Sequence, residues 1–462
     1  MRMLKSKFTL AVASVVSALS IGVITQVAEA ANWLMLQGTE TPGAVGRAEV
    51  WGFVQAEATY LDATKVPAAA WKGSDMAPNT VGPDRSSRAT MNIRRARIGV
   101  RGQGFPLDNK VNYFLLTEFG HNEITVPGGG AYLTDASVTL NHVPFARLRI
   151  GQFKTPGSEE GLQAIHAFDY VNFTNGTDQL LMERFANGDG SSTTDDLIAG
   201  TKPGTYVNKS NGGVGAFRDT GVQLFDTIKM KNIEISYAGM IGNGNGINRQ
   251  DNNGKKDIYG YLSVEQVYGG KGARRDGVKA YVWAHKGKRT LTEEKPGVYN
   301  RDRSGVGATF RKGAYRAGFE YMTASGLIRN GTDGGATIES KSLNGVNASL
   351  NYLLDGKANA YYADFGYKLM KNLELDLRYD VLNRGVDNNN AERTFTTTTL
   401  GAQYFLNKKT RIIVNYEMRS MEVPNVITHP TLVDAAAAIN KAENTNAKGI
   451  DGRASIQLLA IF

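Results

Sequence analysis

Five arginines recur at even spacing in two short segments of this chain. They are Arg95, Arg97, Arg101, Arg147 and Arg149. A guanidinium stays charged at any relevant pH and pairs with oxyanions in a two-pronged geometry. Together with the nearby Lys154, these side chains could form a row of fixed positive charge that favours anions. Alternatively, they could pair with carboxylates such as Glu118 and Asp135 and serve only to tie a loop to a wall.

The segments that carry these arginines alternate apolar and polar side chains, which is the pattern of a half-buried β-strand. In residues 92–103, Ala96, Ile98 and Val100 fall on the face opposite the arginines. The arginine face needs water and room, and the apolar face needs a core or lipid. A transmembrane β-barrel provides both, with lipid outside and a wet lumen inside.

The same alternation continues to the end of the chain and predicts an all-β, antiparallel barrel over residues 31–462. It yields about seventeen strands, and because single-chain bacterial barrels close with an even number, we expect 16, with 18 left open. The excess strand should lie between Gly345 and Leu382, where short turns fall twice in succession. The last strand ends on Phe462, which resembles the assembly signal of bacterial outer-membrane proteins. We therefore expect the outer membrane as the location and lipid as a partner.

The N-terminus and the composition indicate an exported protein. Residues 1–30 contain three early cations, the apolar run Phe8 to Ile24 and an Ala28-Glu29-Ala30 cleavage site, which together predict a secretory signal peptide. Its removal would take away three cations and one anion and lower the formal net charge from +9 to +7. The chain contains no Cys, which excludes disulfides, thiolate metal sites and covalent haem attachment.

Two long interruptions of the strand pattern are expected to be loops. Residues 154–217, the third long loop, should fold into the lumen and narrow it, because a loop of this length is usually functional or disordered. We assign four constriction-loop residues: Glu159, Glu160, Glu183 and Arg184. Glu159 and Glu160 could oppose the arginines across the pore, or lie on a solvent-exposed loop. Residues 421–452 form the last extracellular loop, in which the run Ala435 to Ala438 suggests a helical turn.

Five stretches of the sequence resemble the phosphate-selective porin O and P family. They are IRRARIGVRG (93–102), YFLLTEFG (113–120), LTDASVTL (133–140), LRIGQFKTP (148–156) and LMERF (181–185). The resemblance implies a sixteen-stranded trimeric barrel, an inward-folded third loop and anion passage along lumen cations. The family's Arg-Arg pair maps onto Arg94 and Arg95, of which alternation points Arg95 inward. The phosphate-binding members carry a Lys and Ser-rich run in the third loop, whereas residues 157–163 here contain two carboxylates, so phosphate selectivity is not carried over.

The favoured hypothesis is a homotrimeric porin that passes small hydrophilic solutes, with a preference for small anions. A different hypothesis is a structural barrel that sheathes a partner, such as an electron-transfer cytochrome. A third is a barrel enzyme, but the five histidines have no ligand spacing and no GxSxG elbow is present. We expect no enzyme activity, no cofactor, no metal site and no nucleic-acid partner. Basic residues in the later half, Lys279, Arg311, Arg316 and Arg378, have acidic neighbours and are interpreted as a solvated lumen lining.

Overall fold

The computed structural model describes most of the chain from Asn32 to Phe462. The described residues are 32–36, 38, 48–62, 89–104, 108–120, 130–182, 216–251, 253–272, 274–291, 297–329, 342–343, 346–347, 352–428, 430–431 and 433–462. The expected signal peptide and the residues Glu183 and Arg184 lie outside this range.

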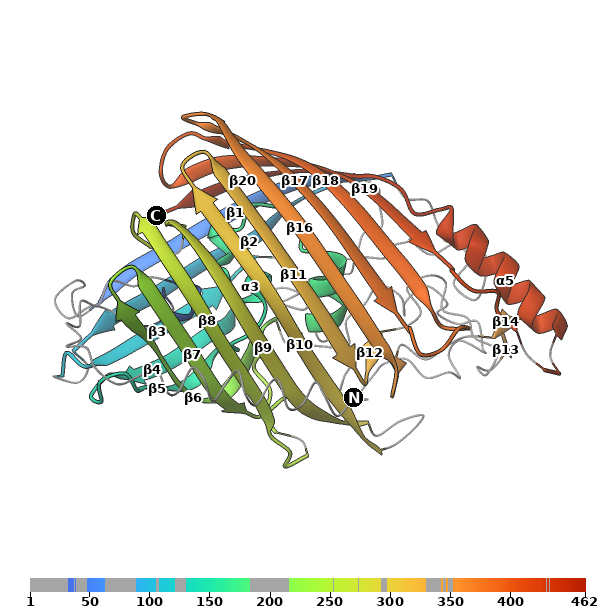
Figure 1. Cartoon of the computed structure of the whole chain (residues 1–462), viewed down its shortest axis with the longest axis horizontal. Helices are drawn as coiled ribbons and strands as arrows, with labels where there is room; N and C mark the ends of the chain where they lie inside the picture. Colours follow the sequence, from blue (N-terminus) through green and yellow to red (C-terminus); the bar gives the residue numbers. More distant parts are fainter. Residues whose placement is uncertain are drawn as a thin grey trace.

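Sixteen antiparallel strands close into a single barrel (Figure 1). The barrel strands are β1 (Glu49–Leu61), β2 (Ala89–Gln103), β3 (Val111–Glu118), β4 (Tyr132–Leu140), β5 (Arg147–Lys154), β6 (Arg218–Met230), β7 (Ile233–Gly242), β8 (Asp257–Gly269), β9 (Asp276–Leu291), β10 (Gly297–Lys312), β11 (Tyr315–Ser325), β16 (Lys357–Met370), β17 (Leu373–Arg384), β18 (Arg393–Phe405), β19 (Thr410–Glu422) and β20 (Arg453–Ile461). Because β1 pairs with both β2 and β20, the sheet has no free edge, as a lipid environment requires. The predicted fold class is confirmed, with 16 strands.

The strand predicted at residues 346–354 is wrong. This segment belongs to one long connection between β11 and β16. In the described residues of that connection the strands are two residues long: β12 (Ile328–Arg329), β13 (Ser342–Leu343), β14 (Val346–Asn347) and β15 (Tyr352–Leu353). These strands pair with one another, β12 with β15 and β13 with β14, and not with the barrel. A small ladder in a loop shares the local alternation of a membrane strand, which explains the odd count.

Short turns gather at one end of the barrel and long loops at the other. Strands β10 and β11, for example, are joined by a tight turn at Gly313, whereas β19 and β20 are separated by a loop that contains α5 (Val433–Ala447). In Figure 1 the short turns lie at the upper left and α5 extends to the right. The helical turn expected at residues 435–438 is thus part of a longer helix.

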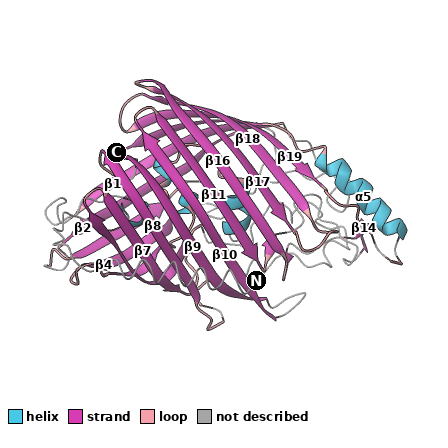
Figure 2. Cartoon of the chain, viewed as in Figure 1, coloured by secondary structure: helices cyan, strands magenta, loops and turns pink. Residues whose placement is uncertain are grey.

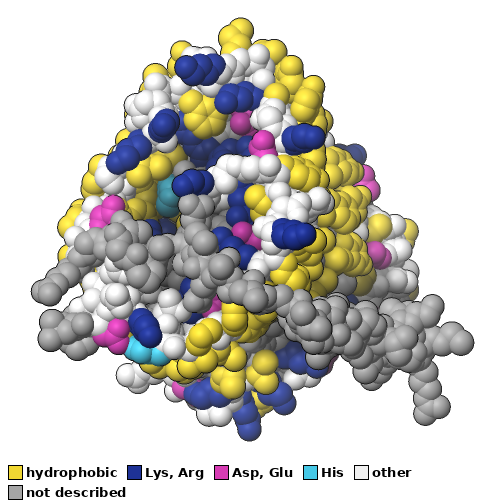
Figure 3. Space-filling view, turned by 60° about the vertical axis from the view of Figure 1, so that its left-hand side comes forward, with side chains coloured by type: hydrophobic (Ala, Val, Ile, Leu, Met, Phe, Trp, Pro, Cys, Tyr) yellow, Lys and Arg dark blue, Asp and Glu magenta, His cyan; other side chains and the backbone are white. Residues whose placement is uncertain are grey.

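The two faces of the wall differ in the way that the alternation predicts. Ile98, Leu115 and Ile150 are exposed on the outside, whereas Arg97 and Glu118 are buried on the inside. Figure 3 shows hydrophobic side chains gathered over the outer wall. Outward apolar and inward polar side chains are the arrangement of a barrel in lipid.

The seam of the barrel uses the last residue of the chain. The backbone of Phe462 exchanges two hydrogen bonds with Gly52 of β1, at N···O distances of 3.0 and 3.1 Å. A Cβ at position 52 would collide with the Phe462 ring and with the Arg97 carbonyl oxygen. Glycine therefore lets the terminal aromatic ring lie flat against β1, where it completes closure.

A short helix near the N-terminus, α2 (Trp33–Leu36), lies inside the barrel, a feature that the sequence pattern did not predict. The side-chain amide of Asn32 donates to Ser236 of β7 at 2.7 Å, and the indole of Trp33 donates to Glu159 at 3.0 Å. Figure 2 shows the small helices enclosed by the strands. Among the described residues, no helix combines the length and the apolar character needed to cross a membrane.

Candidate functional site in the barrel lumen

The described part of the third loop, residues 155–182, lies against the inner wall of the barrel. It contains α3 (Glu159–Leu162), η1 (Ile165–Ala167) and η2 (Thr177–Leu181). The hydroxyl of Ser158 caps α3 by accepting from the Gly161 amide at 3.1 Å. This segment contacts two parts of the wall, which we call the N-terminal wall (β1–β6) and the C-terminal wall (β9–β11 and β16–β19).

Glu159 joins the loop to the C-terminal wall. Both of its carboxylate oxygens accept from the Lys279 ammonium, at 2.8 and 2.6 Å. The residue is buried, and Trp33 of α2 donates to the same carboxylate. Glu159 therefore fixes the loop and α2 to strand β9, and it does not lie on a solvent-exposed loop.

Glu160 makes a second link to the same wall. Its carboxylate accepts from the Arg378 guanidinium at 3.1 Å and from the Thr174 hydroxyl at 2.7 Å. Burial raises the pKa of Glu160, against the opposing influence of Arg378, Thr177 and Thr174. This carboxylate is thus also buried and engaged, with its charge directed at β17.

Asp169 is the centre of a cluster of arginines. Its carboxylate lies 2.6 Å from Arg274, 3.4 Å from Arg316 and 3.7 Å from Arg411. Burial alone would raise the pKa of Asp169, but these guanidiniums, with Arg311, outweigh it and hold the pKa well below its usual range. Three loop carboxylates thus neutralise cations that lie on the C-terminal wall or next to it. The interpretation of Lys279, Arg316 and Arg378 as a merely solvated lining is therefore wrong.

The loop meets the N-terminal wall through neutral groups instead. The Lys154 ammonium donates to the carbonyl oxygen of Gly161 at 2.8 Å and also to that of Gln163. The side-chain amide of Gln55 donates to the Ile165 carbonyl at 3.4 Å. These contacts hold the loop without adding negative charge to this wall.

The predicted arginines all belong to the N-terminal wall, but their surroundings differ. Arg97 pairs with Glu118 at 2.7 Å, and Arg147 pairs with Asp226. These two therefore fit the alternative in which an arginine pairs with a wall carboxylate. The other carboxylate expected in that role, Asp135, pairs with Arg218 of β6 at 2.9 Å.

The described contacts of the other candidate cations include uncharged groups. Arg95 donates to the Gln55 side chain at 3.0 Å, and Arg101 donates to the Leu36 carbonyl oxygen of α2 at 3.4 Å. The Arg149 guanidinium stacks 4.2 Å from the centroid of the Phe225 ring and reaches the Thr139 hydroxyl. A stacked guanidinium keeps its charge while its face is covered by an apolar surface.

Arg94 also points inward, although strict alternation predicts the opposite. The pairing of β1 with β2 shifts register between Gln55 and Ala56, which leaves Arg94 as the extra residue of a β-bulge. Arg94 is fully buried and pairs with Glu57 at 2.6 Å. The bulge thus turns both members of the Arg-Arg pair to the lumen.

Several lumen arginines were missed by the sequence analysis. Arg301 and Arg303 bind the Leu180 carbonyl oxygen at 3.1 and 2.8 Å and so hold the end of η2. The strand predicted there began at Val306, whereas β10 begins at Gly297. The even spacing of Arg301 and Arg303 was the available signal.

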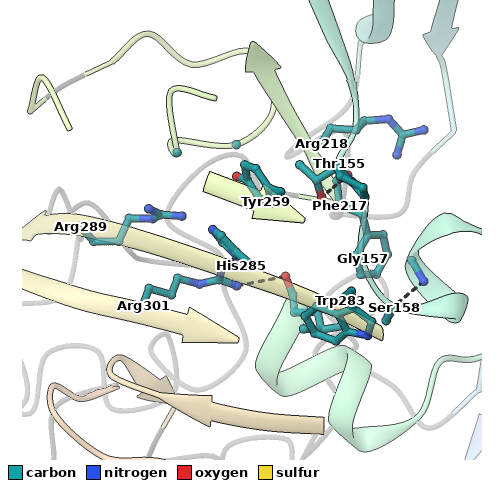
Figure 4. Close-up of a pocket in the computed structure, with 15 residues that line it drawn as sticks. Thr155, Gly157, Ser158, Phe217, Arg218, Tyr259, Trp283, His285, Arg289 and Arg301 are labelled. Atoms are coloured by element: carbon teal, nitrogen blue, oxygen red, sulfur yellow. Dashed lines mark hydrogen bonds between the residues drawn. The ribbon is translucent and has the colours of Figure 1, made fainter. Parts of the chain in front are cut away.

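Three cavities flank the described loop, and one of these, about 80 Å³ in volume, is bordered by Glu159, Asp169 and Lys279. Another, of about 60 Å³, is bordered by Arg218, Arg289 and Arg301. Figure 4 shows Arg289, Arg301 and His285 on one side of this cavity and Arg218, Phe217 and Ser158 on the other. The largest of the three, of about 190 Å³, lies between the loop, α2 and strands of the N-terminal wall. Within the described part of the chain, no group of His, Cys, Asp and Glu side chains could hold a metal ion.

A closed, sixteen-stranded barrel with an apolar exterior and an inward-packed loop is the architecture of an outer-membrane porin, a class whose barrels leave an aqueous channel. The family model for phosphate-selective porin O and P matches residues 74–423. The chain belongs to this family, and its location is the bacterial outer membrane.

Solved structures of similar fold include two outer-membrane channels. An anion-selective porin from Comamonas acidovorans aligns with a TM-score of 0.52 and 15% identity, over 90% of this chain and 99% of that chain. The outer membrane channel DcaP of Acinetobacter baumannii aligns with a TM-score of 0.50 and 13% identity, over 92% of this chain and 100% of that chain. At these identities the likeness shows the fold alone. No curated protein matches the sequence.

Proposed function

We propose that this porin passes small hydrophilic solutes by diffusion and prefers anions, which travel along the N-terminal wall. The observation that carries the proposal is the charge of the largest cavity, which is bordered by five cations and, among the described residues, by no carboxylate. The path comprises Arg95, Arg97, Arg101, Arg147, Arg149 and Lys154. Fixed cations beside a narrow aqueous path lower the energy of an anion and raise that of a cation.

The arrangement supports a general anion path rather than one dedicated to phosphate. In residues 157–163, Ser158 is used to cap α3, and Glu159 and Glu160 are used to anchor the loop. The two carboxylates accept hydrogen bonds and cannot donate to a phosphate group. The alternative of a barrel that sheathes a partner is disfavoured, because residues 155–182 and α2 occupy space that the partner would need.

The native assembly proposed is a homotrimer without residues 1–30. The homotrimer is proposed from the family, and the removal of residues 1–30 is proposed from the signal-like N-terminus. Edman sequencing of the outer-membrane protein should give Ala31 as the first residue, and chemical crosslinking in membranes should give a trimer as the largest specific product. An intact Met1 would contradict the proposed cleavage, and crosslinking that yields only monomer would contradict the proposed trimer.

The test of the ion preference is the reversal potential of single channels in a planar bilayer under a KCl gradient. We expect an anion-selective potential that shifts toward zero in Arg95→Ala and in Arg147→Ala. Each variant should keep the heat-dependent electrophoretic mobility of a folded barrel. A folded protein with a cation-selective potential would refute the proposal, as would a folded barrel that conducts no ions.

A further inference from the structure

The cavity of about 190 Å³ between the loop, α2 and the N-terminal wall has an aromatic lining that a simple ion path does not need. Trp51 and Phe53 of β1 and Phe114 of β3 form one side of it, and Ile165 of the loop and Leu34 of α2 contribute apolar surface on the other. These groups come from four separate parts of the chain. The cavity therefore exists only because the loop and α2 are packed inside the barrel.

The aromatic rings of this cavity contact one another and fix its shape. The Trp51 and Phe114 ring centroids lie 5.9 Å apart, and the His166 ring lies 5.2 Å from Phe53 and 5.7 Å from Trp51. Tilted and edge-on arrangements at these distances are favourable. A fifth ring, from a ligand, could join this cluster through the same type of contact.

Cations border the same cavity. They are Arg97, Arg101, Arg149, Lys154 and Arg218. Two of these, Arg97 and Arg218, are paired with Glu118 and Asp135, which stand behind them and do not border the cavity. Arg101 lies 5.9 Å from the Phe114 ring centroid, so positive charge and aromatic surface meet at one place.

The state of His166 reports the local electrostatics. Burial, together with the charges of Arg411, Lys154, Arg97 and Arg101, lowers the pKa of His166 to about 3. Its imidazole is therefore neutral at physiological pH and adds a ring rather than a charge to the lining.

We propose that this cavity binds small aromatic monocarboxylates, with the ring among Trp51, Phe53 and Phe114 and the carboxylate toward Arg101 and Arg149. The proposal rests on the proposed function, because it names the class of anion that the arginine path selects. A cavity of about 150 Å³ with an apolar lining is known to hold benzene, so about 190 Å³ suits a benzoate-sized molecule. The smaller cavity of Figure 4, at about 60 Å³, is too small for such a ring.

The test compares three probes, namely benzoate, acetate and benzyl alcohol, as blockers of the single-channel chloride current. Benzoate should reduce the current at a concentration about tenfold or more below that of acetate, because its ring leaves water. Benzyl alcohol, which carries the ring without the charge, should block no better than acetate. Equal block by benzoate and acetate would overturn the proposal.

Two variants locate the site and one serves as a matched control. Trp51→Leu and Arg101→Gln should each bring the benzoate-to-acetate ratio close to one. Trp283→Phe, which changes an aromatic side chain of the smaller cavity, should leave the ratio unchanged. If Trp51→Leu lacks the heat-dependent electrophoretic mobility of a folded barrel, the benzoate-to-acetate ratio of Arg101→Gln decides the position of the site by itself. Loss of the ratio in Trp283→Phe, or its retention in Arg101→Gln, would refute this position for the site.

The outcome is distinguishable from failure of the proposed function. If the KCl reversal potential is not anion-selective, the proposed function fails and the benzoate site loses its basis. If the potential is anion-selective but benzoate has no advantage over acetate, only the aromatic-carboxylate site is refuted.

Discussion

The N-terminal and C-terminal walls of the lumen are both rich in basic side chains, but the third loop contacts the two walls through different chemical groups. It meets the C-terminal wall with carboxylates, such as Glu159 on Lys279 and Asp169 on Arg316, as well as with carbonyl oxygens such as that of Leu180. It meets the N-terminal wall with carbonyl oxygens, which accept from Lys154. The loop carboxylates therefore neutralise basic residues of the C-terminal wall. On the N-terminal wall, Arg97 and Arg147 instead pair with carboxylates of the wall itself.

The difference shows that the number of arginines in a barrel does not by itself define an ion path. Breaking a buried ion pair by removing one partner is expensive, so the anchors of the C-terminal wall set the position of the loop. Cations that contact neutral groups contribute less to that position. Under the proposed function, the cations of the N-terminal wall act on a passing solute.

The largest effect is expected from removing the centre of the C-terminal cluster. Asp169→Ala leaves Arg274, Arg316 and Arg411 close together without their shared carboxylate. Loss of one partner in a buried pair costs about 3–5 kcal/mol, so the loop should loosen and the single-channel conductance should rise. Asp169→Glu serves as the control that keeps the charge. Unchanged conductance and current noise in Asp169→Ala would show that this anchor does not hold the loop.

The next largest effect should separate the two walls directly. The double variant Arg95→Ala/Arg149→Ala on the N-terminal wall should lower the anion-to-cation permeability ratio on the order of fivefold, since a nearby unit charge acts strongly where water is restricted. Arg411→Ala on the C-terminal wall should change it less. Reversal potentials in a salt gradient measure both. An equal or larger effect of Arg411→Ala would break the distinction between the walls.

A change in pH is expected to have a smaller effect on the anion preference. The pKa of Glu160 is raised by burial, so this carboxyl takes up a proton at a higher pH than an ordinary glutamate, while Asp169, whose pKa is held low, stays ionised. As pH falls through the raised pKa the loop loses one negative charge, and the anion preference should increase. Because the folded state binds this proton more tightly than the unfolded chain, the same step adds folding stability.

Glu160→Gln should show the increased anion preference already at neutral pH and should lack the pH-dependent step. The permeability ratio as a function of pH measures this. The same step in Glu160→Gln as in the wild type would assign the titration to another group.

The smallest effect on selectivity is expected where a cation contacts only the loop backbone in the described contacts. Lys154→Met removes two hydrogen bonds to the Gly161 and Gln163 carbonyls, at a cost of about 1–3 kcal/mol for the acceptors left behind. The barrel should become less resistant to heat, as read by its electrophoretic mobility, with a small change in reversal potential. A shift as large as that of Arg95→Ala/Arg149→Ala would place Lys154 among the principal determinants of the path.

The sequence predicted the barrel well, because period-two alternation is a local property that each strand carries by itself. The prediction failed where an alternating segment does not belong to the barrel wall. Strands β14 and β15 are the example, because their residues alternate but pair with other short strands of the same loop. It also failed at Arg94, because a β-bulge depends on the pairing partner and not on the strand's own pattern.

The candidate site was predictable only in part, for a related reason. The inward arginines of β2 and β5 follow from alternation, but their charge balance depends on contacts across the lumen. Glu160 and Arg378 are 218 residues apart in the chain, and no spacing rule joins them. The helix α2 lacked any periodic signal, because four residues are too few to show a helical period.

The most direct test of the account is where anions reside in the lumen. Crystals of the porin soaked in bromide and measured at the bromine absorption edge would reveal these positions by anomalous scattering. We expect bromide sites along the N-terminal wall near Arg95, Arg101 and Arg149. Sites confined to the C-terminal wall, around Lys279, Arg316 and Arg378, would contradict the account.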